Sequence, residues 1–581
     1  MSSGKSLRAP LFKRDRLRPG QKVVGPAMIV EQTGTVIVED GWIGEIDYHQ
    51  HLILQRFQKK VRQHAAGTTV DPVLLEVFNN LFMSIAEQMG ATLANTAYSV
   101  NIKERLDFSC ALFDREGQLV ANAPHVPVHL GSMGESIRTV IRENGTTMKA
   151  GNVYMLNAPY NGGTHLPDVT VITPVFSKDN VEVLFYVASR GHHADIGGRT
   201  PGSSPPDSQH IDEEGVLIDN FLLVEEGLFR EEETRELLGS GIYPCRNINQ
   251  NIADLTAQIA ANETGLRELN KMVDTFGLKV VQRYMQHVQD NAEECVRRVL
   301  DVLQDCQFTY PMDNDRQICV NISVDRQKRE ATIDFTGTSG QHQGNYNAPT
   351  SVCKAAVLYV FRTLVADNIP LNQGCMKPLK LVIPEKTMIS PEYPAAVISG
   401  NTEVSQAITD ALYGALGILA SSQGTMNNFV YGNATHQNYE TICGGTGAGP
   451  DHPGTSAVHS HMTNTKMTDP EVVEWRFPVR VESFSIREGS GGAGLFQGGD
   501  GAVREIRFLE DMTATILSSH RETAPYGLEG GLAGKTGENR VVRADGSVIN
   551  LGGNDEIEMR SGDTFIIKTP GGGGFGWGSK C

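Results

Sequence analysis

Two short β-type runs near the N-terminus, residues 27–31 and 35–39, flank a Thr33-Gly34 turn. Apolar and β-branched residues on both sides of a glycine turn are typical of a β-hairpin. An isolated hairpin is only marginally stable in water, so we expect this one to close something larger. The polar residues 58–69 predict a linker, and we place two domains at residues 1–60 and 61–581.

Helical periodicity marks the next part of the chain. Asp71 followed by Pro72 combines a helix N-cap with a proline suited to the first helical position. Apolar residues then recur at helical spacing, which predicts a long core helix through Leu74, Val77, Phe78, Leu81, Ile85, Met89 and Leu93. A second helical region is predicted to begin near Ala253, and its clearest apolar face carries Val281, Tyr284, Met285, Val288, Ala292, Cys295, Val296 and Val299.

The remaining pattern mixes strands, helices and glycine-rich loops. Between residues 101 and 208, short β-type runs alternate with Gly, Pro, Asn and His. Further strands and one helix are predicted at 169–175, 183–187, 320–324, 331–335 and 351–365. The last third is rich in glycine, and we interpret residues 571–574 as a flexible or tightly turned tail. This order of elements predicts a large α+β fold.

The charge and cysteine content limit the partners and the compartment. A formal net charge of −17 repels phosphate groups, so we expect neither nucleic acid nor an anionic membrane as a partner. Nine scattered cysteines without a C-x-x-C pair are typical of reduced thiols, and no apolar signal segment opens the chain, so we expect a cytoplasmic protein. The glycine runs contain no G-x-x-x-x-G-K-[ST] motif and predict no nucleotide site.

Histidine and aspartate gather between residues 122 and 195. The candidates in this region are His125, His129, His165, Asp168, His192, His193 and Asp195. Imidazole and carboxylate donors without cysteine suit a divalent Mn, Fe or Zn ion in an open, catalytic coordination sphere. The alternative, that these histidines are hydrogen-bonded residues of structural loops, stays open because their spacing is not a specific motif.

The predicted elements indicate how such a site would form. His165 and Asp168 stand three residues apart in a loop that enters the strand at 169–175. His192 and His193 end another apolar run, and adjacent side chains of a strand point to opposite faces. We therefore expect one of the two to complete the site and the other to face away or to support it, with the choice left open.

Two further polar patches are candidates for contact with a substrate or with the metal pocket. The first contains Glu104, Arg105 and Asp107, for which a structural salt-bridge network is an equally good interpretation. The second contains His459 and His461, which would share one face of an extended segment. They would either reach the metal pocket or hydrogen-bond a loop.

Several of these segments together resemble the hydantoinase B/oxoprolinase family. They are NIKERLDFSC at 101–110, NAPHVPVHLG at 122–131, GTHLPD at 163–168, ASRGHHADIGG at 188–198 and HSHMTNT at 459–465. The resemblance runs from about residue 71 to residue 576 and is closest to the second half of single-chain oxoprolinases. Residues 25–42 resemble the closing hairpin of the hydantoinase-A-like half, so a hydantoinase-B-like unit is expected after a short β-rich remnant of an A-like domain.

This resemblance implies ATP-dependent opening of 5-oxo-L-proline to L-glutamate. The A-like half would bind ATP and Mg and phosphorylate the amide oxygen, and the B-like half would open the activated ring with water. By the family's H-x-x-D pattern, His165 and Asp168 are implied as metal ligands. The resemblance implies His192 or His193 as a third ligand, a pocket with His125, His129 and Asp195, and weaker substrate contacts from Glu104, Arg105 and Asp107.

The chain lacks an ATP-binding half, so we expect it to act in an oligomer with a hydantoinase-A-type partner, or else to be a truncated and inactive product. Three alternatives remain. One is a hydantoin or N-methylhydantoin as the cyclic amide substrate. Another is a non-catalytic assembly subunit with structural histidines, and the third is a stand-alone metallohydrolase that needs no ATP.

Overall fold

The computed structural model describes residues 8–57, 70–367 and 369–577. The predicted linker at 58–69 and the expected boundary after residue 60 lie outside the described residues. The chain divides into a small N-terminal unit and a large unit that contains nearly all of the remainder. No helix among the described residues is both long enough and apolar enough to cross a membrane.

The small unit is built from two three-stranded sheets, with strand orders β1-β3-β4 and β2-β5-β6. The predicted hairpin is confirmed, because β3 and β4 pair antiparallel with Ala27 opposite Val38. Its apolar core contains Val23, Ala27, Ile29 and Val38. The strands are β1 (Leu11–Lys13), β2 (Lys22–Val24), β3 (Ala27–Val30), β4 (Thr35–Val38), β5 (Trp42–Ile46) and β6 (Leu52–Arg56), with a 3-10 turn at Arg14–Arg16.

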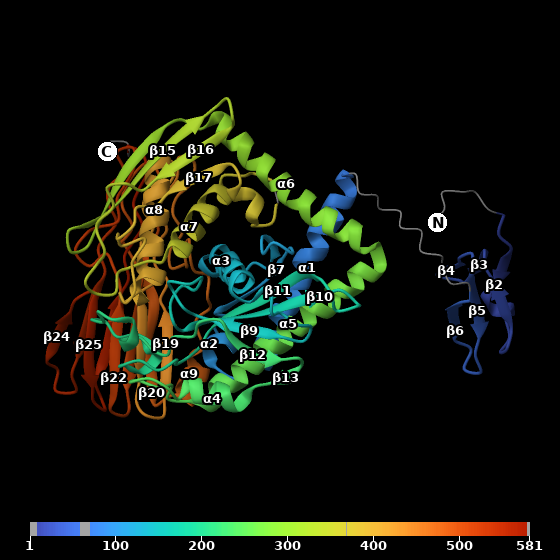
Figure 1. Ribbon diagram of the computed structural model, residues 1–581, viewed down its shortest axis with the longest axis horizontal. Helices are drawn as coiled ribbons and strands as arrows, with labels where there is room; N and C mark the ends of the chain where they lie inside the picture. The colour runs from blue at the N-terminus through green and yellow to red at the C-terminus, as the bar shows by residue number, and fades with distance from the viewer. Residues whose placement is uncertain (1–7, 58–69, 368, 578–581) are drawn as a thin grey trace. The chain divides into compact units, whose positions relative to one another are not determined.

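A seven-stranded antiparallel sheet of the large unit has the strand order β13-β12-β9-β10-β11-β7-β8 (Figure 1). The predicted strands at 169–175 and 183–187 are confirmed as β10 and β11, each longer than expected. The strands are β7 (Phe108–Phe113), β8 (Leu119–Asn122), β9 (Val153–Leu156), β10 (Asp168–Phe176), β11 (Val183–His192), β12 (Phe221–Glu225) and β13 (Leu228–Phe229).

Two helices, α3 (Pro127–Asn144) and α5 (Ile248–Phe276), cover opposite faces of this sheet. On β11, the Ser189 hydroxyl donates to the carbonyl oxygen of Gln258 in α5 at 3.4 Å. The next residue, Arg190, donates from Nη2 to the hydroxyl of Ser136 in α3 at 2.8 Å. Successive side chains of a strand point to opposite sides, so the sheet lies between the two helices.

The predicted long helices are confirmed as α1 (Pro72–Thr96), α5 and α6 (Leu278–Val302). Asp71 caps α1 as expected, because its Oδ1 accepts hydrogen bonds of 2.9 Å from the backbone N–H groups of Val73 and Leu74. The remaining short helices of the large unit's first half are α2 (Val100–Lys103) and α4 (Glu231–Leu238), with 3-10 turns at Pro201–Ser203, Ile211–Glu213 and Gln373–Met376.

Helix α3 contradicts the expectation of only short β-type runs between residues 101 and 208. Its sequence contains two glycines, Gly131 and Gly134, and two serines, and these residues have low helix propensity. The local sequence therefore gives no clear helical signal. The packing explains the glycines: a methyl group on Gly131 would lie 2.5 Å from the Cα atom of Ala355 in α7 (Thr350–Thr363). Close contact with α7 therefore stabilises a helix that local propensity does not predict.

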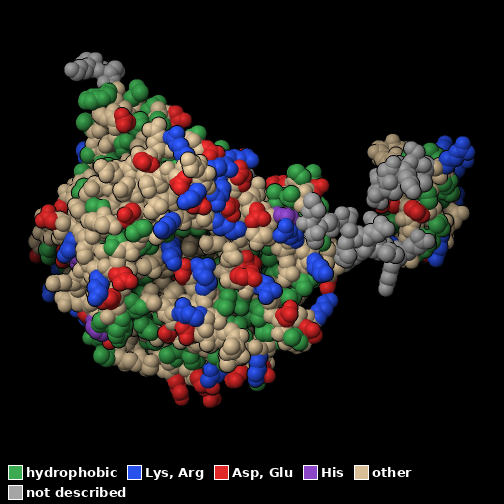
Figure 2. Space-filling model, turned by 45° about the horizontal axis from the view of Figure 1, so that its top comes forward, with side chains coloured by type: hydrophobic (Ala, Val, Ile, Leu, Met, Phe, Trp, Pro, Cys, Tyr) green, Lys and Arg blue, Asp and Glu red, His purple; other side chains and the backbone are tan. Residues whose placement is uncertain are grey.

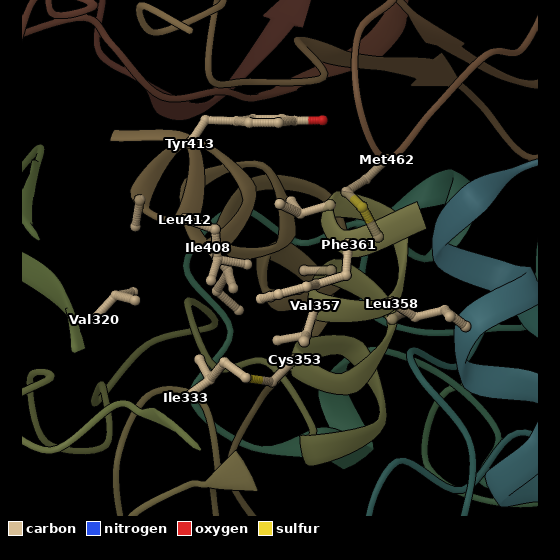
Figure 3. Packing of buried hydrophobic residues seen from close by; sticks show 14 of the residues in the cluster. Val320, Ile333, Cys353, Val357, Leu358, Phe361, Ile408, Leu412, Tyr413 and Met462 are labelled. Atoms are coloured by element: carbon tan, nitrogen blue, oxygen red, sulfur yellow. The ribbon is translucent and has the colours of Figure 1, made fainter. Parts of the chain in front are cut away.

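An extensive apolar core lies where α7 and α8 (Ser405–Leu416) pack together and against a four-stranded sheet (Figure 3). Cys353, Val357 and Phe361 of α7 face Ile408 and Leu412 of α8 in this core. The sheet has the order β14-β15-β16-β17, with β14 (Cys306–Met312), β15 (Arg316–Asp325), β16 (Glu330–Asp334) and β17 (Leu379–Val382). The predicted strands at 320–324 and 331–335 and the helix at 351–365 are thereby confirmed.

Two further sheets from the last third of the chain pack face to face, and the rings of Phe429 and Phe565 meet between them at 4.5 Å. Their orders are β19-β18-β22-β25 and β20-β21-β26-β23-β24. The elements are β18 (Asn428–Gly432), β19 (Gln437–Thr441), α9 (Pro470–Arg476), β20 (Val479–Arg487), β21 (Gly501–Phe508), β22 (Met512–Leu517), β23 (Glu538–Val542), β24 (Val548–Leu551), β25 (Asn554–Met559) and β26 (Thr564–Lys568).

The glycines at 571–574 form a packed segment, so of the two interpretations, a flexible or a tightly turned tail, the flexible one is wrong. All four are buried, and their backbone N–H groups donate to backbone carbonyl oxygens of neighbouring loops. Gly572 donates to the Gly499 carbonyl oxygen at 2.9 Å and Gly573 to that of Ser421 at 2.8 Å. A side chain at Gly572 would lie 1.9 Å from the carbonyl oxygen of Thr446, so only glycine permits this approach.

We expect Gly572→Ala to destabilise the protein by about 1–3 kcal/mol, the usual cost of overpacking a filled interior. The midpoint of urea denaturation measures this effect. Gly340→Ala is the control, since Gly340 is exposed and a methyl group there would lie 4.0 Å from the carbonyl oxygen of Lys386. Equal midpoints for the two variants would contradict the tight packing of this segment.

The surface shows no separation of charge by sign on the face seen in Figure 2, where acidic and basic side chains are interspersed. The excess of acidic residues is therefore distributed rather than gathered in one patch on that face. Surface features alone indicate no binding site there, and the candidate site lies inside the large unit.

Candidate active site

Asp168 is the centre of the candidate site. It is the first residue of β10, and the antiparallel register pairs it with His192, the last residue of β11. One carboxylate oxygen, Oδ1, lies 3.0 Å from His165 Nε2 and 3.0 Å from His192 Nδ1. His165 comes from the loop that enters β10, so two strand ends and one loop bring these three side chains together.

The second carboxylate oxygen of Asp168 meets three other side chains. Oδ2 lies 3.1 Å from His129 Nε2 on α3, and it accepts hydrogen bonds of 3.1 Å from Thr164 Oγ1 and from Asn401 Nδ2. Asn401 lies in a π-helical turn, Gly400–Val404, that leads into α8. Four separate segments of the chain thus converge on one buried carboxylate.

Burial and charge act in opposite directions on this carboxylate. Burial by itself raises the pKa of Asp168, but the charges of His129 and His165 bring it well below its usual value. Burial lowers the pKa of His192, and the hydrogen bond with Asp168 partly opposes that shift. The arrangement therefore favours an ionised carboxylate among imidazole rings.

His165, Asp168 and His192 fit a metal ion. Their ligand atoms all lie within 4.8 Å of one another, and all three side chains are buried. His192 Nε2 and both ring nitrogens of His165 have no partner with hydrogen-bond geometry among the described residues. Buried polar atoms rarely lack a partner in native proteins, and nitrogen and carboxylate donors of this kind suit Mn, Fe and Zn.

The structure distinguishes the two adjacent histidines. His192 points toward Asp168, whereas both ring nitrogens of His193 are engaged by α5. Nε2 of His193 lies 3.1 Å from Gln258 Oε1, and Nδ1 lies 3.1 Å from Asn251 Nδ2. Of the two alternatives that the sequence left open, the geometry favours His192 as the inward residue.

Two other candidates of this region lie outside the cluster. Asp195 accepts hydrogen bonds from the backbone of Gly197, Gly202 and Arg246 and from Arg246 Nη1, so it holds a turn. His125 Nδ1 accepts from the backbone N–H of Cys110 at 3.0 Å, and its ring packs against Gly90 of α1. Neither side chain contacts Asp168 in the described structure.

The residues of the first polar patch have separate surroundings. Arg105 is fully buried and donates to the Tyr439 carbonyl oxygen at 2.6 Å, with its guanidinium over the Tyr439 ring. Glu104 lies 3.8 Å from Arg476 near the surface, and the carbonyl oxygen of Asp107 accepts from His192 N at 3.0 Å. Arg105 and Asp107 therefore both have buried side chains near the site, and the charge of Asp107 partly opposes the lowering of the His192 pKa by burial.

The second patch does not form an extended segment with two histidines on one face, so that expectation is wrong. His461 has a positive φ of 55° in a turn, which separates the directions of the two side chains. His461 Nε2 lies 3.1 Å from Asp410 Oδ1 of α8. The ring nitrogens of His459 are shielded from solvent and have no hydrogen-bond partner in the part of the chain that the structure describes.

Three residues that shape the site, Asn401, Tyr439 and Arg190, were not predicted as site residues. Asn401 contacts Asp168 from more than 200 positions away, and Tyr439 stacks on the His192 ring at a centroid distance of 4.5 Å. Arg190 is buried beside them and binds only hydroxyl groups. Of these three, only Arg190 could have been found from the sequence, because it stands two residues before His192 in the same predicted strand region.

Comparison with known proteins finds two family models in the chain. Residues 71–578 match hydantoinase B/oxoprolinase, and residues 2–57 match the hydantoinase/oxoprolinase C-terminal domain. The resemblance noted in the sequence is therefore confirmed, as is the order of a small A-type remnant before a large B-type unit.

The chain is also similar to curated proteins and to a solved structure. The 5-oxoprolinase of Dictyostelium discoideum is 45% identical and the 5-oxoprolinase 1 of Arabidopsis thaliana 46% identical, each over 98% of this chain. The chain covers 45% and 46% of those proteins, so it spans about half the length of the curated relatives it matches.

The solved structure of an ATP-dependent caprolactamase from Pseudomonas jessenii aligns with a TM-score of 0.79 and 24% identity. The alignment covers 87% of this chain and 91% of that one. At this identity the likeness shows the fold alone, and it confirms the predicted α+β architecture.

Proposed function

Because the chain belongs to the hydantoinase B/oxoprolinase family, we propose that it opens an ATP-activated cyclic amide, 5-oxo-L-proline, to give L-glutamate. The observation that carries this proposal is the buried Asp168 with His165 and His192, in a chain similar throughout to 5-oxoprolinases. The chain spans about half of those relatives, so activation by ATP is assigned to a hydantoinase-A-type partner or domain.

The chemistry explains why two parts are needed. Resonance protects the carbonyl carbon of a lactam from attack by water. Phosphorylation of the amide oxygen removes this protection, and that step belongs to the ATP-binding part. The B-type chain then has to bind the activated ring, orient a water molecule and receive the proton that this water loses.

His165, Asp168 and His192 would hold a divalent metal ion, which when bound supplies a hydroxide at neutral pH or a Lewis acid for the developing oxyanion. The protein residues prepare the site for it. His129, Thr164 and Asn401 all contact Oδ2 of Asp168 and so orient the carboxylate. Burial by α3, α5 and the π-helical turn keeps bulk water away from the activated amide.

We expect His192→Gln to lose its bound metal and His193→Gln to retain it. The two substitutions are matched, since both replace a buried histidine of one dipeptide, but only His192 points toward Asp168. Elemental analysis of the purified variants, grown with Mn, Fe and Zn, measures the difference. Metal loss from His193→Gln alone would assign the site to the other face of the sheet.

The activity is tested by supplying the ATP-binding part in trans. We expect release of L-glutamate from 5-oxo-L-proline only when the chain, the ATP-binding part and ATP are all present. Hydantoin and N-methylhydantoin are assayed in parallel, and a faster reaction with either would replace the proposed substrate. Hydrolysis without ATP would contradict the two-part mechanism, and a wild-type chain that holds no transition metal would favour a non-catalytic assembly role.

A further inference from the structure

Several buried polar atoms without hydrogen-bond partners belong to residues that connect to the Asp168 site through direct contacts, beyond the proposed metal ligands. Nearly all buried polar atoms in native proteins are paired, so a group of unpaired ones indicates a place where another molecule binds. In the described residues the unpaired atoms of this region include Asn401 Oδ1, Gln406 Oε1, Ser460 Oγ, Arg105 Nε and both ring nitrogens of His459.

One series of contacts leads from Asp168 to His459. Asn401 donates to Asp168 Oδ2 at 3.1 Å. Gln406, just over one turn further along the same continuous helix, donates from Nε2 to the Ser460 carbonyl oxygen at 3.0 Å. His459 precedes Ser460, so this helix links the carboxylate to the segment that carries His459.

A second series of contacts leads from His459 back to the site. Arg105 Nη2 donates to Thr465 Oγ1 at 3.4 Å, in the segment that follows His459, and the charge of Arg105 adds to burial in lowering the pKa of His459. Arg105 lies over the Tyr439 ring at 4.6 Å, and Tyr439 stacks on His192 at 4.5 Å. The two series form a closed ring of contacts. Arg105 and His459 therefore belong to the same buried region as His192.

The Arg105 guanidinium forms no direct ion pair among the described residues, although the buried acid Asp107 places its charge near the same Tyr439 ring. Its guanidinium donates to neutral oxygens only, those of Tyr439 O at 2.6 Å, Thr441 Oγ1 at 3.0 Å and Thr465 Oγ1 at 3.4 Å. The adjacent acid, Glu104, pairs with Arg476 instead. A fully buried guanidinium without a direct ion pair is costly, and a bound anion would lower that cost.

We propose that Arg105 and His459 bind an oxyanion of the substrate beside Asp168. The inference rests on the proposed function and adds a specificity site to it. A phosphorylated lactam acid offers two oxyanions, the ring carboxylate and the phosphoryl group, and the unpaired Nε–H of Arg105 can donate a charge-assisted hydrogen bond to either one. Burial and the charge of Arg105 lower the pKa of His459 to about 4, so the ring is neutral and donates one N–H.

Isothermal titration calorimetry on the full chain tests this inference with three probes. They are 5-oxo-L-proline, 2-pyrrolidinone, which is the same ring without the carboxylate, and inorganic phosphate. Tight binding of 5-oxo-L-proline over 2-pyrrolidinone identifies the carboxylate as the anion, and phosphate binding that competes with 5-oxo-L-proline identifies the phosphoryl group. In either case we expect Arg105→Lys and His459→Gln to lower the affinity for the anion by about tenfold or more.

Arg476→Lys and His452→Gln are the controls, because each changes the same residue type outside the interior, and both should bind the anion as the wild type does. His459→Gln keeps the test decisive if Arg105→Lys does not fold. Wild-type affinity for both anions in His459→Gln and Arg105→Lys would overturn the inference. Equal binding of 5-oxo-L-proline and 2-pyrrolidinone without phosphate binding would overturn it as well.

The metal content of each variant separates this inference from the proposed function. We expect Arg105→Lys and His459→Gln to keep the wild-type amount of metal, since neither residue belongs to the proposed ligand set. A wild-type chain that binds the anion but holds no metal would refute the metal-dependent mechanism and leave the oxyanion site standing.

Discussion

Asp168→Asn is expected to abolish metal binding and to reduce the activity of the assembled enzyme by more than 100-fold. Loss of a group that merely supports a ligand costs roughly 10–100-fold, and Asp168 would be a ligand itself. The amide has no negative charge to balance a divalent ion, and its N–H₂ group would face the donors of His129, Thr164 or Asn401. Elemental analysis and glutamate release with the ATP-binding part measure the two effects.

Asp195→Asn is the matched control for this variant. Asp195 is also buried and also lies in the histidine-rich region, but its carboxylate holds Arg246 and a turn. We expect this control to keep its metal and to lose stability. Full metal content in Asp168→Asn would mean that the ion, where present, is bound elsewhere.

Glu440→Gln is expected to destabilise the protein by about 3–5 kcal/mol, because it leaves a buried guanidinium without its anion. Glu440 of β19 and Arg504 of β21 are each 1% exposed, and two contacts of 2.8 and 3.2 Å join them. The midpoint of urea denaturation measures the loss. Glu440 adjoins Tyr439, so the same pair helps to fix the strand whose tyrosine stacks on His192.

A surface ion pair provides the comparison. Glu538→Gln removes an acid that is half exposed and that pairs with Arg487 at 2.7 Å and with Lys568 at 3.3 Å. Solvent screens such pairs, and we expect a change below about 1 kcal/mol. If Glu440→Gln shifts the midpoint no further than Glu538→Gln does, the buried pair does not stabilise the fold.

Local signals predicted the elements that depend mainly on local physics. The cap and proline at Asp71 and Pro72 located the start of α1, and the glycine turn located the hairpin of β3 and β4. Helix α3 was missed because its glycines disfavour a helix until α7 packs against them. The interpretation of the glycines at 571–574 as flexible failed for a related reason. These glycines permit close contact with distant backbone, and that contact is visible only in the folded chain.

The sequence by itself indicated the family, the α+β class and the candidate residues His165, Asp168 and one of His192 and His193, because these lie in continuous motifs whose residue types limit the chemistry. Only the tertiary structure decided that His192 rather than His193 points inward, since the choice depends on which sheet face α5 covers. It also brought Asn401 to Asp168 and Arg105 with Tyr439 to His192. Contacts between residues hundreds of positions apart leave no local periodicity, because they arise only when separate elements pack together.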